Sequence, residues 1–205
     1  IDNDVWGTET SFGFDTAVTI ATEAIDRLHS TASAHQRVMV IEVMGDKAGW
    51  IALHSGMAGG GDIILIPELE YNIHNIGNTI IERLKKGKTY SIVVVAEGIK
   101  TIDGKKAAEY IAQEIEYETG FETRETVLGY IQRGGTPTAF DRNLATRMGG
   151  YATEMIATGQ FGRMVALRND KITSIPLEEV AGKVKLVNEK HDLIIQGKRM
   201  GICFG

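Results

Sequence analysis

Short runs of β-branched and other apolar residues recur along the chain and predict five strands. These runs occupy residues 37–44, 62–67, 90–97, 123–131 and 162–169. Most of them are continuously apolar and do not alternate with polar residues, which indicates strands buried on both faces.

The segments between these runs carry apolar residues at spacings of three and four, which is the helical period. They occupy residues 14–30, 47–59, 75–87, 105–120 and 140–159. Because buried strands alternate with helices, the pattern predicts an α/β protein. We expect parallel-rich sheets flanked by helices in a Rossmann-like, three-layer arrangement.

The composition narrows the class of protein. The 205 residues are 43% hydrophobic and 24% charged, which is typical of a globular protein, and the net charge of −5 argues against a nucleic acid or an anionic membrane as partner. No apolar run is long enough to cross a bilayer. A single cysteine, Cys203, excludes an internal disulfide, and with no signal peptide visible it favours a cytoplasmic location.

Polar residues and glycines follow three of the predicted strands. Ligands of parallel sheets bind beyond the carboxyl ends of the strands, so these positions are candidates for a binding site. They are Met44, Gly45, Asp46, Glu97, Gly98, Tyr130, Gln132 and Arg133.

The stretch "LGYIQRGGTPTAFDR" at 128–142 carries the most chemistry. A strand leads into Arg133 and two glycines, and a helix is predicted to start at Thr136 and Pro137. Glycines allow close backbone approach, a helix N-terminus favours negative charge, and arginine offers a planar fork to a phosphate. The alternative interpretation is a plain strand-to-helix turn with a surface arginine, which is the commoner case for an isolated Gly-rich turn.

Four separated motifs occur in the order, and nearly at the spacing, of the phosphofructokinase family: "IDND…GFDTA", "RVMVIEVMG", "SIVVVAEG" and "TRETVLGYIQRGGTPTAFDR". The chain resembles the C-terminal part of a bacterial-type 6-phosphofructokinase, least closely over 100–119 and after about 170. This resemblance implies a phosphofructokinase fold that begins inside the signature "TIDND" and lacks the Gly-rich N-terminal segment that holds the nucleotide.

The resemblance also implies a division into domains. Residues 1–15 would end the nucleotide-side domain and carry the catalytic aspartate loop. Residues 16–134 would form most of the sugar-phosphate domain, and residues 135–205 would return toward the nucleotide side.

For the acid pair, the resemblance implies that Asp2 is the catalytic base and that Asp4 shapes the site and supports Mg²⁺. Carboxylates suit both roles. Without the resemblance, "DND" would be interpreted as a helix-capping loop.

Three arginines match family positions that hold the sugar phosphate: Arg37, Arg124 and Arg133. Arg37 is also assigned to catalysis. Arginine suits a dianion through bidentate, charge-assisted hydrogen bonds. In the family the first two reach in from a neighbouring subunit, so the resemblance implies a homo-oligomer, a dimer or tetramer, with shared active sites. Taken separately, each arginine could equally be a surface charge.

The other substrate-binding residues that the resemblance implies are Ile1, Met44, Gly45, Asp46, Glu97, Tyr130, Ile131 and Gln132. Glu97 would accept hydrogen bonds from sugar hydroxyls. The chain departs from the family pattern at Asp46, which is commonly basic, and at Tyr130, which is commonly histidine. At effector-site positions it carries His29 and Asp62, which puts control by nucleotide or phosphoenolpyruvate in question.

The implied activity is glycolytic: fructose 6-phosphate is phosphorylated at its 1-hydroxyl, with Mg²⁺ and with ATP narrowly favoured as donor. Two alternatives stay open, a pyrophosphate-dependent phosphotransferase and a non-catalytic sugar-phosphate-binding module. We expect the 205 residues alone not to be a competent kinase. His54, His74 and His191 lack metal-ligand spacing, so we expect capping or surface roles for them and no zinc site.

Overall fold

Four parallel strands form the central sheet of the computed structural model, which describes residues 1–205 apart from the side chain of Asp103. The strands are β1 (Val38–Val43), β2 (Ile63–Leu65), β3 (Ser91–Ala96) and β4 (Thr123–Val127), in the order β2-β3-β1-β4. Val40 of β1 is in register with Val93 of β3 and with Glu125 of β4. The predicted parallel sheet is confirmed.

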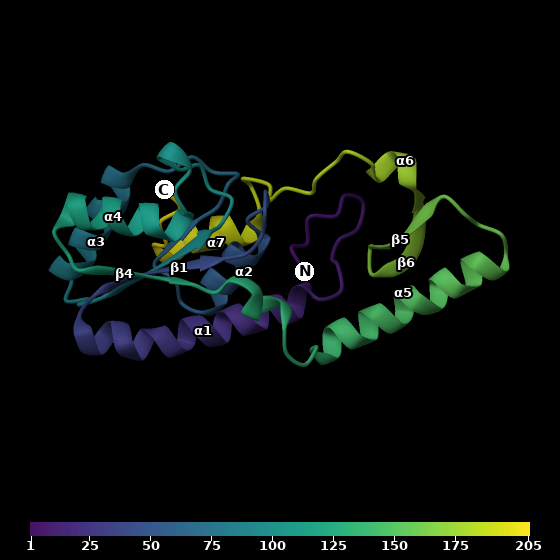
Figure 1. The fold of residues 1–205 in the computed structure, drawn as a ribbon, viewed down its shortest axis with the longest axis horizontal. Helices are drawn as coiled ribbons and strands as arrows, with labels where there is room; N and C mark the ends of the chain where they lie inside the picture. The colour runs from purple at the N-terminus through teal and green to yellow at the C-terminus, as the bar shows by residue number, and fades with distance from the viewer.

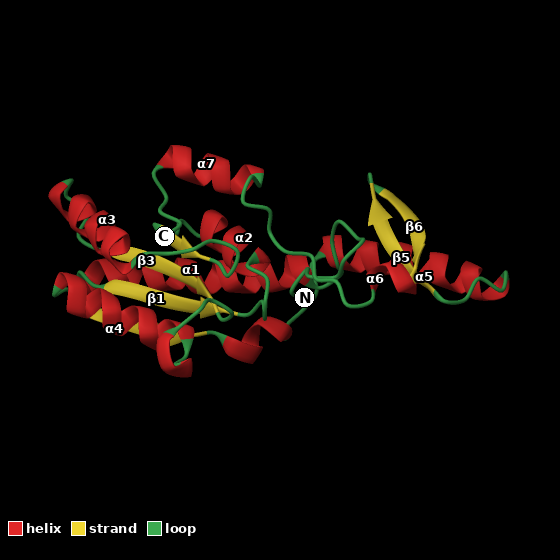
Figure 2. Cartoon of the chain, turned by 90° about the horizontal axis from the view of Figure 1, so that it is seen from above, coloured by secondary structure: helices red, strands yellow, loops and turns green.

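Helices cover both faces of this sheet. α1 (Phe14–His35) packs against α2 (Trp50–Ala58), and α3 (Ile73–Lys85) packs against α4 (Ala107–Thr119). Figure 1 shows α1 on one side of the sheet and α4 on the other, and Figure 2 gives the same layers from above. The predicted three-layer arrangement is therefore present. A short 3-10 turn, η1 (Ile102–Gly104), precedes α4.

The buried strands contain a carboxylate, Glu42 of β1. β1 and β3 are buried along their whole length, and Glu42 of β1 is only 8% exposed. Its Oε2 accepts a hydrogen bond from the backbone N–H of Ala108 at 2.8 Å, in the first turn of α4. A buried carboxylate at a helix N-terminus satisfies a free N–H and interacts favourably with the helix dipole.

A second, smaller unit consists of α5 (Ala139–Ala157), β5 (Arg163–Arg168), β6 (Lys171–Pro176) and the short α6 (Leu177–Val180). Its small core contains Leu144, Met148 and Leu167. β5 lies where a strand was predicted, but it does not extend the parallel sheet. It pairs antiparallel with β6, which the sequence analysis missed.

The turn between β5 and β6 explains this pairing. Asn169 and Asp170 have positive φ values of 49° and 59°. Two successive residues of this conformation form the tight turn that matches the twist of a two-stranded hairpin. The strand at 162–169 is therefore present, and its antiparallel partner β6 was missed because an Asn-Asp hairpin signal was overlooked.

The strand predicted for 123–131 ends earlier than expected. β4 stops at Val127, and η2 (Gly129–Arg133) follows as a 3-10 turn, with Gly129 at φ 52°. The next helix, α5, starts at Ala139 and not at Thr136 or Pro137. Thr138 caps it, since its Oγ1 accepts from the N–H of Asp141 at 3.3 Å.

The C-terminal segment returns to the large unit. Residues 181–191 lead from α6 to α7 (Asp192–Met200), which packs on α2. Val187, Ile194 and Phe204 all belong to the large core. The division of the chain into domains at residues 15 and 134 stays a prediction. Among the described residues, no helix combines the length and the apolarity that a bilayer span requires.

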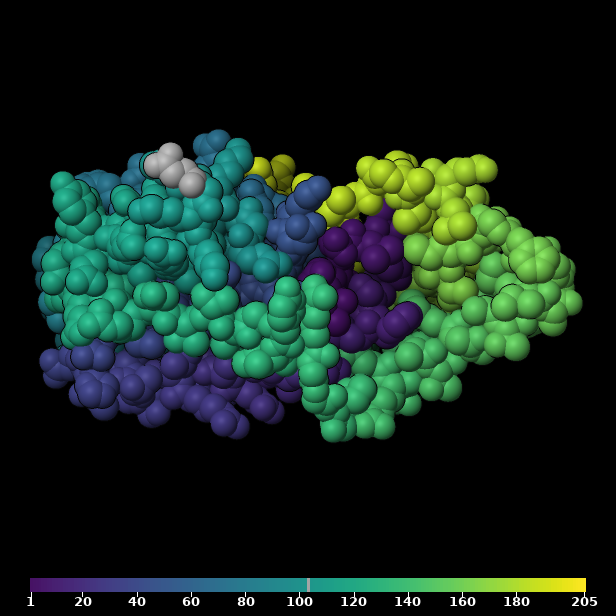
Figure 3. Space-filling model, in the orientation of Figure 1, coloured from purple at the N-terminus to yellow at the C-terminus, as the bar shows by residue number. Residues whose placement is uncertain are grey.

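The N-terminal residues lie between the two units. Figure 3 shows residues 1–12, in purple, at the surface between the sheet-containing unit and the unit built on α5. Ile1 lines a pocket with Arg133, and Asp2 lies within reach of the charges of Glu97 and Arg133, so the start of the chain lies at the carboxyl edge of the central sheet.

Candidate active site

The carboxyl ends of β1 and β4 are tied together by Gln132. Its side chain is 1% exposed. The amide oxygen accepts from the N–H of Met44 at 3.3 Å, and the amide nitrogen donates to the carbonyl of Gly129 at 3.0 Å. The turn at η2 aims this side chain back at the sheet, which a continuous strand would not do. Gln132 therefore supports the site through the backbone of Met44 and Gly129, and its role in substrate binding stays a prediction.

Glu97 organises the turn that follows β1. Its Oε1 accepts from the N–H groups of Gly45 at 3.0 Å and Asp46 at 2.9 Å. Gly45 has φ 152°, and a Cβ there would lie 2.4 Å from the carbonyl oxygen of Ala48, so only glycine fits. The Glu97 side chain is exposed, and its Oε2 has no hydrogen bond to any described residue. One carboxylate oxygen thus stays available to a hydroxyl donor.

Asp2 lies close to this turn and is partly buried. Its Oδ1 is buried and has no hydrogen-bond partner among the described residues. Burial raises the pKa of the Asp2 carboxyl above its usual range, and the charges of Asp4 and Glu97 act in the same direction. The guanidinium of Arg133 opposes the rise in this pKa. A carboxylate with a raised pKa is a better proton acceptor.

A pocket of about 310 Å³ brings Ile1 together with the Gly-rich turn. Gln132, Arg133 and Gly134 line one side of it, and Asp141 lines another. The guanidinium of Arg133 also lies 5.5 Å from the ring centroid of Tyr130. Tyr130 and Ile131 are 81% and 61% exposed, so both can meet a ligand or another chain.

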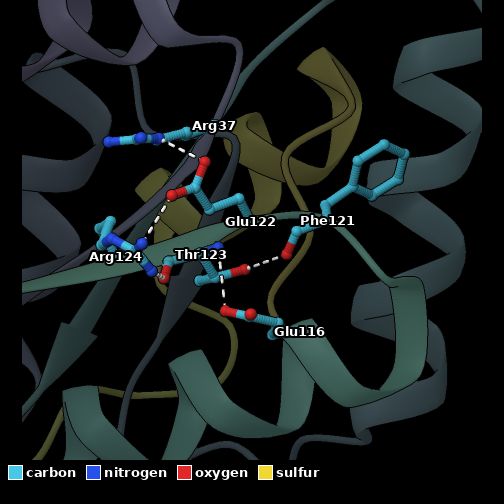
Figure 4. Close-up of polar contacts among 6 residues, drawn as sticks. All are labelled: Arg37, Glu116, Phe121, Glu122, Thr123 and Arg124. Carbon is cyan, nitrogen blue, oxygen red and sulfur yellow. Dashed lines mark hydrogen bonds and ion pairs between the residues drawn. The ribbon is translucent and has the colours of Figure 1, made fainter.

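Arg37 and Arg124 lie at the opposite edge of the sheet. Arg37 directly precedes β1, and Arg124 is the second residue of β4. Figure 4 shows both side chains held by Glu122: Arg37 Nε lies 2.8 Å from Oε2, and Arg124 Nη2 lies 2.6 Å from Oε1. The single chain therefore brings Asp2, Glu97 and Arg133 to one edge and leaves the other two predicted arginines at the other.

Comparison with known proteins decides the family. The family model described as phosphofructokinase matches residues 1–156. The chain belongs to the phosphofructokinase family. It is 81% identical to "ATP-dependent 6-phosphofructokinase 3" of Bacteroides thetaiotaomicron over 205 residues, which is 100% of this chain and 61% of that protein. The chain thus spans about three fifths of the curated relatives it matches, and it aligns with their C-terminal part.

Other phosphofructokinases differ in the named phosphoryl donor. The chain is 49% identical to "Pyrophosphate--fructose 6-phosphate 1-phosphotransferase" of Streptomyces coelicolor, over 92% of this chain and 60% of that protein. Among solved structures, phosphofructokinase from Saccharomyces cerevisiae matches with a TM-score of 0.78 and 34% identity, covering 87% of this chain and 24% of that one. The pyrophosphate-dependent enzyme from Marinobacter aquaeolei matches with a TM-score of 0.79 and 26% identity, over 100% of this chain and 55% of that one.

The effector-site positions named from the sequence are engaged within the chain. Asp62 Oδ1 lies 2.7 Å from Arg83 Nη2, and Asp62 Oδ2 accepts from the N–H of Ile92 at 2.9 Å. His29 Nε2 lies 2.6 Å from the carbonyl oxygen of Gly59. Burial raises the pKa of Asp62, and this backbone hydrogen bond and Arg83 oppose the rise.

The three histidines singled out earlier occupy structural positions. His191 caps α7 by accepting from the N–H of Leu193 at 3.3 Å, and His74 Nδ1 pairs with Glu118 at 2.7 Å. Burial lowers the pKa of His54 to about 4, and His191 and Lys185 add to this shift. Within the described part of the chain, no three His, Cys, Asp or Glu side chains gather as metal ligands.

Two residues of the site were missed from the sequence. Asn3, between the two aspartates, is 4% exposed and accepts hydrogen bonds from Ser11 and from Lys185. Lys185 lies in the region where the family resemblance is weakest, and a lone lysine in an irregular segment gives no recognisable signal. The Lys185 ammonium also donates to the carbonyl of Thr8, so Asn3 and Thr8 are joined through Lys185.

Proposed function

We propose that the protein transfers the terminal phosphoryl group of ATP to the 1-hydroxyl of fructose 6-phosphate and forms fructose 1,6-bisphosphate. The observation that supports this most directly is the position of Asp2 beside Glu97 and Arg133, with a raised pKa and an unpartnered buried oxygen. Family membership and relatives named as ATP-dependent 6-phosphofructokinases support the same reaction class.

In this proposal Asp2 accepts the proton of the 1-hydroxyl as the hydroxyl oxygen attacks phosphorus. A positioned base is the part of phosphoryl transfer that needs a protein carboxylate, while the rest depends on alignment and charge neutralisation. Glu97 holds a sugar hydroxyl through its free Oε2. Met44 and Gly45 supply packing and backbone contacts at the sugar, beside Asp46, Tyr130, Ile131 and Ile1.

Mg²⁺ fits the oxygen donors of this loop. The ion takes one or two protein carboxylates and completes its shell with water and substrate phosphates, so a cluster of three protein ligands is not required. Asp4, with Asp2 nearby, would hold it at this edge of the sheet. When bound there, Mg²⁺ would neutralise charge on the transferred phosphoryl group.

The 6-phosphate of the sugar would be bound by Arg133 of one subunit and by Arg37 and Arg124 of another. The separation of these arginines within one chain supports this arrangement, because a six-residue strand lies between Arg37 and Met44. We propose a homo-oligomer, a dimer or tetramer, in which each active site combines the carboxyl edge of one sheet with the amino edge of its neighbour. We also propose a cytoplasmic location, which the presence of a single cysteine, Cys203, supports.

Pyrophosphate is the second candidate donor. Relatives and solved neighbours named as pyrophosphate-dependent match the chain over most of its length. Because relatives named for either donor match the chain, similarity does not select the donor, and the choice requires an assay.

A chimera provides this assay. The N-terminal two fifths of the 81%-identical relative, which this chain does not match, are joined in front of Ile1. The chimera and the 205-residue chain are each tested with fructose 6-phosphate, Mg²⁺ and either ATP or pyrophosphate. We expect fructose 1,6-bisphosphate from the chimera with ATP only. The added segment comes from a relative named as ATP-dependent, so product with pyrophosphate alone would mean that the 205 residues set the donor, and it would select pyrophosphate. Fructose 6-phosphate binding without product would favour a non-catalytic module.

A further inference from the structure

The loop that carries Asp2 and Asp4 is held at its far end by the second unit. The N–H of Glu9 donates to the carbonyl of Leu167 at 2.9 Å, and the N–H of Leu167 donates to Thr8 Oγ1 at 2.9 Å. Arg168 Nε donates to the carbonyl of Gly7 at 2.9 Å. These contacts fix residues 7–9 on β5 and do not reach the two aspartates.

Lys185 links the near end of the loop, at Asn3, to its far end, at Thr8 and Glu9. The ammonium group donates to Asn3 Oδ1 at 2.8 Å, to the carbonyl of Thr8 at 3.0 Å and to the carbonyl of Glu9 at 2.9 Å. An ammonium has three donors, and here all three are used by oxygens of the same loop. Asn3 lies directly between Asp2 and Asp4, so the hydrogen bond from Lys185 to Asn3 acts next to the two aspartates.

The Asn3 side chain also connects the start of the loop to its end at Ser11. Its Oδ1 also accepts from the N–H of Ser11 at 3.1 Å, and Asn3 itself has a left-handed φ of 57°. The backbone of Lys185 adds a further link, because its N–H donates to the carbonyl of Asp4 at 2.7 Å. Val5 and Val184 form an antiparallel bridge beside it.

Lys185 is in turn fixed to the large unit. Its carbonyl accepts from Trp50 Nε1 at 2.7 Å, and its ammonium lies 5.3 Å from the centroid of the Trp50 ring. Two residues later, the N–H of Val187 donates to Glu68 Oε1 at 2.9 Å. Trp50 begins α2 directly after the turn that contains Gly45, so one continuous set of contacts joins this turn to the aspartate loop.

We propose that Lys185 is the positioning residue that sets the aspartate loop, and with it Asp2, against the sugar-binding turn. This inference rests on the proposed function, because Asp2 matters to rate only if it is the base. The Lys185 ammonium donates no hydrogen bond to the Asp2 carboxylate, and it acts on Asp2 through the neighbouring Asn3. An error of about 1 Å in the position of a reacting group can cost about a hundredfold in rate, so loss of this restraint should appear in kcat.

Lys185→Met tests the proposal in the chimera. Methionine keeps much of the aliphatic stem on Trp50 and removes all three donors. Lys183→Met is the matched control, since Lys183 is exposed and lies over Trp6, with its ammonium 5.7 Å from the ring centroid. Hydrogen exchange of the peptide 2–11 and steady-state kinetics are measured for each variant.

We expect Lys185→Met to speed exchange of the 2–11 peptide at least about tenfold. We also expect it to lower kcat about 10- to 100-fold while KM for fructose 6-phosphate changes less than about threefold. Exchange in β1 and β3 should be unchanged, which shows that the sheet is intact. Lys183→Met should change none of these values.

Lys185→Arg provides a second variant if the methionine variant does not fold. It restores a charged donor at the same place, so loop protection and kcat should recover in part. Equal losses in the two variants would assign the effect to altered packing and would overturn the proposal. Unchanged loop exchange, or a loosened loop with unchanged kcat, would also overturn it. An inactive parent chimera would refute the proposed function, and hydrogen exchange would still decide whether Lys185 orders the loop.

Discussion

The two edges of the central sheet hold the predicted site residues in different ways. At the carboxyl edge, Glu97 and Gln132 are tied to backbone N–H groups of the turn after β1. At the amino edge, Arg37 and Arg124 share one carboxylate, Glu122, and all three side chains are 31% to 52% exposed. The first edge is rigid and preformed, and the second is an adjustable surface ion pair.

The distance between the edges shows how the two can cooperate. Arg37 and Met44 flank the six residues of β1, and the seven Cα-to-Cα steps between them, at about 3.3 Å each, span about 23 Å. One sugar phosphate cannot span that distance to meet both edges of one sheet. Two copies placed with opposite edges facing each other would bring both sets of groups to one ligand, so an oligomer is required if both sets bind it.

The largest effect is expected at the carboxyl edge, from Asp2→Asn. The amide cannot accept the hydroxyl proton, so we expect kcat of the chimera to fall about 10²- to 10⁴-fold with little change in fructose 6-phosphate affinity. Asp26→Asn, at an exposed aspartate of α1, is the control. A loss in kcat smaller than about tenfold would place the base elsewhere.

A mixing experiment tests whether the two edges serve one site. Arg124→Ala should weaken fructose 6-phosphate binding by about 1.5–3 kcal/mol, the range for hydrogen bonds to charged groups. When this variant is unfolded, mixed with Asp2→Asn and refolded, half of randomly formed dimers would be mixed and would contain one intact site of two. We therefore expect recovery of about a quarter of the wild-type activity.

A second mixture serves as the control. Asp2→Asn and Arg133→Ala both damage the carboxyl edge, so every shared site in that mixture contains one damaged carboxyl edge. No recovery is expected there. Recovery in neither mixture would contradict shared sites, and equal recovery in both would contradict the assignment of Arg124 to a separate edge.

Glycine replacements compare the rigidity of a turn at each edge: Gly45 follows β1 at the carboxyl edge, and Gly87 lies between α3 and the start of β3 at the amino edge. Gly45 and Gly87 both have positive φ, but a Cβ at Gly45 would lie 2.4 Å from a backbone oxygen, while a Cβ at Gly87 meets nothing within 4 Å. We expect Gly45→Ala to lower the free energy of unfolding by about 2–3 kcal/mol and Gly87→Ala by only about 1 kcal/mol. Urea titration measures both, and equal losses would show that the turn after β1 can relax.

The sequence indicated most of the carboxyl edge because this edge is built locally. Strand ends, glycines and "QRGG" are short signals, and the family motifs place them in order. It did not indicate Lys185, because this residue acts through contacts with residues 176 or more positions away in the chain. The strand β6 was missed because the Asn169-Asp170 turn before it was overlooked. The helix α7 was missed because it belongs to a weakly matching tail that packs on α2.

The amino edge shows a different limit of sequence reasoning. Arg37 and Arg124 were named as candidates for one site, and their side chains do share Glu122. Glu122 itself carried no signal in the sequence. Its role depends on β1 and β4 being neighbours, which periodicity does not reveal. The predicted roles of these arginines toward a sugar phosphate stay predictions.

The smallest expected effect comes from Glu122→Gln. A phosphate dianion bound by Arg37 and Arg124 would compete with the Glu122 carboxylate, which lies within 2.8 Å of both guanidinium groups. Removing one negative charge near 5 Å from the anion relieves about 0.8 kcal/mol of repulsion per unit charge in water, so fructose 6-phosphate affinity should rise about two- to fivefold.

Stability should change by less than about 1 kcal/mol, because all three side chains are exposed. Raising the salt to about 0.5 M should remove most of the gain in affinity. Glu109→Gln, at an exposed position of α4, controls for the change in net charge. Weaker binding by Glu122→Gln in calorimetry would mean that Glu122 orients the arginines and does not compete with the ligand.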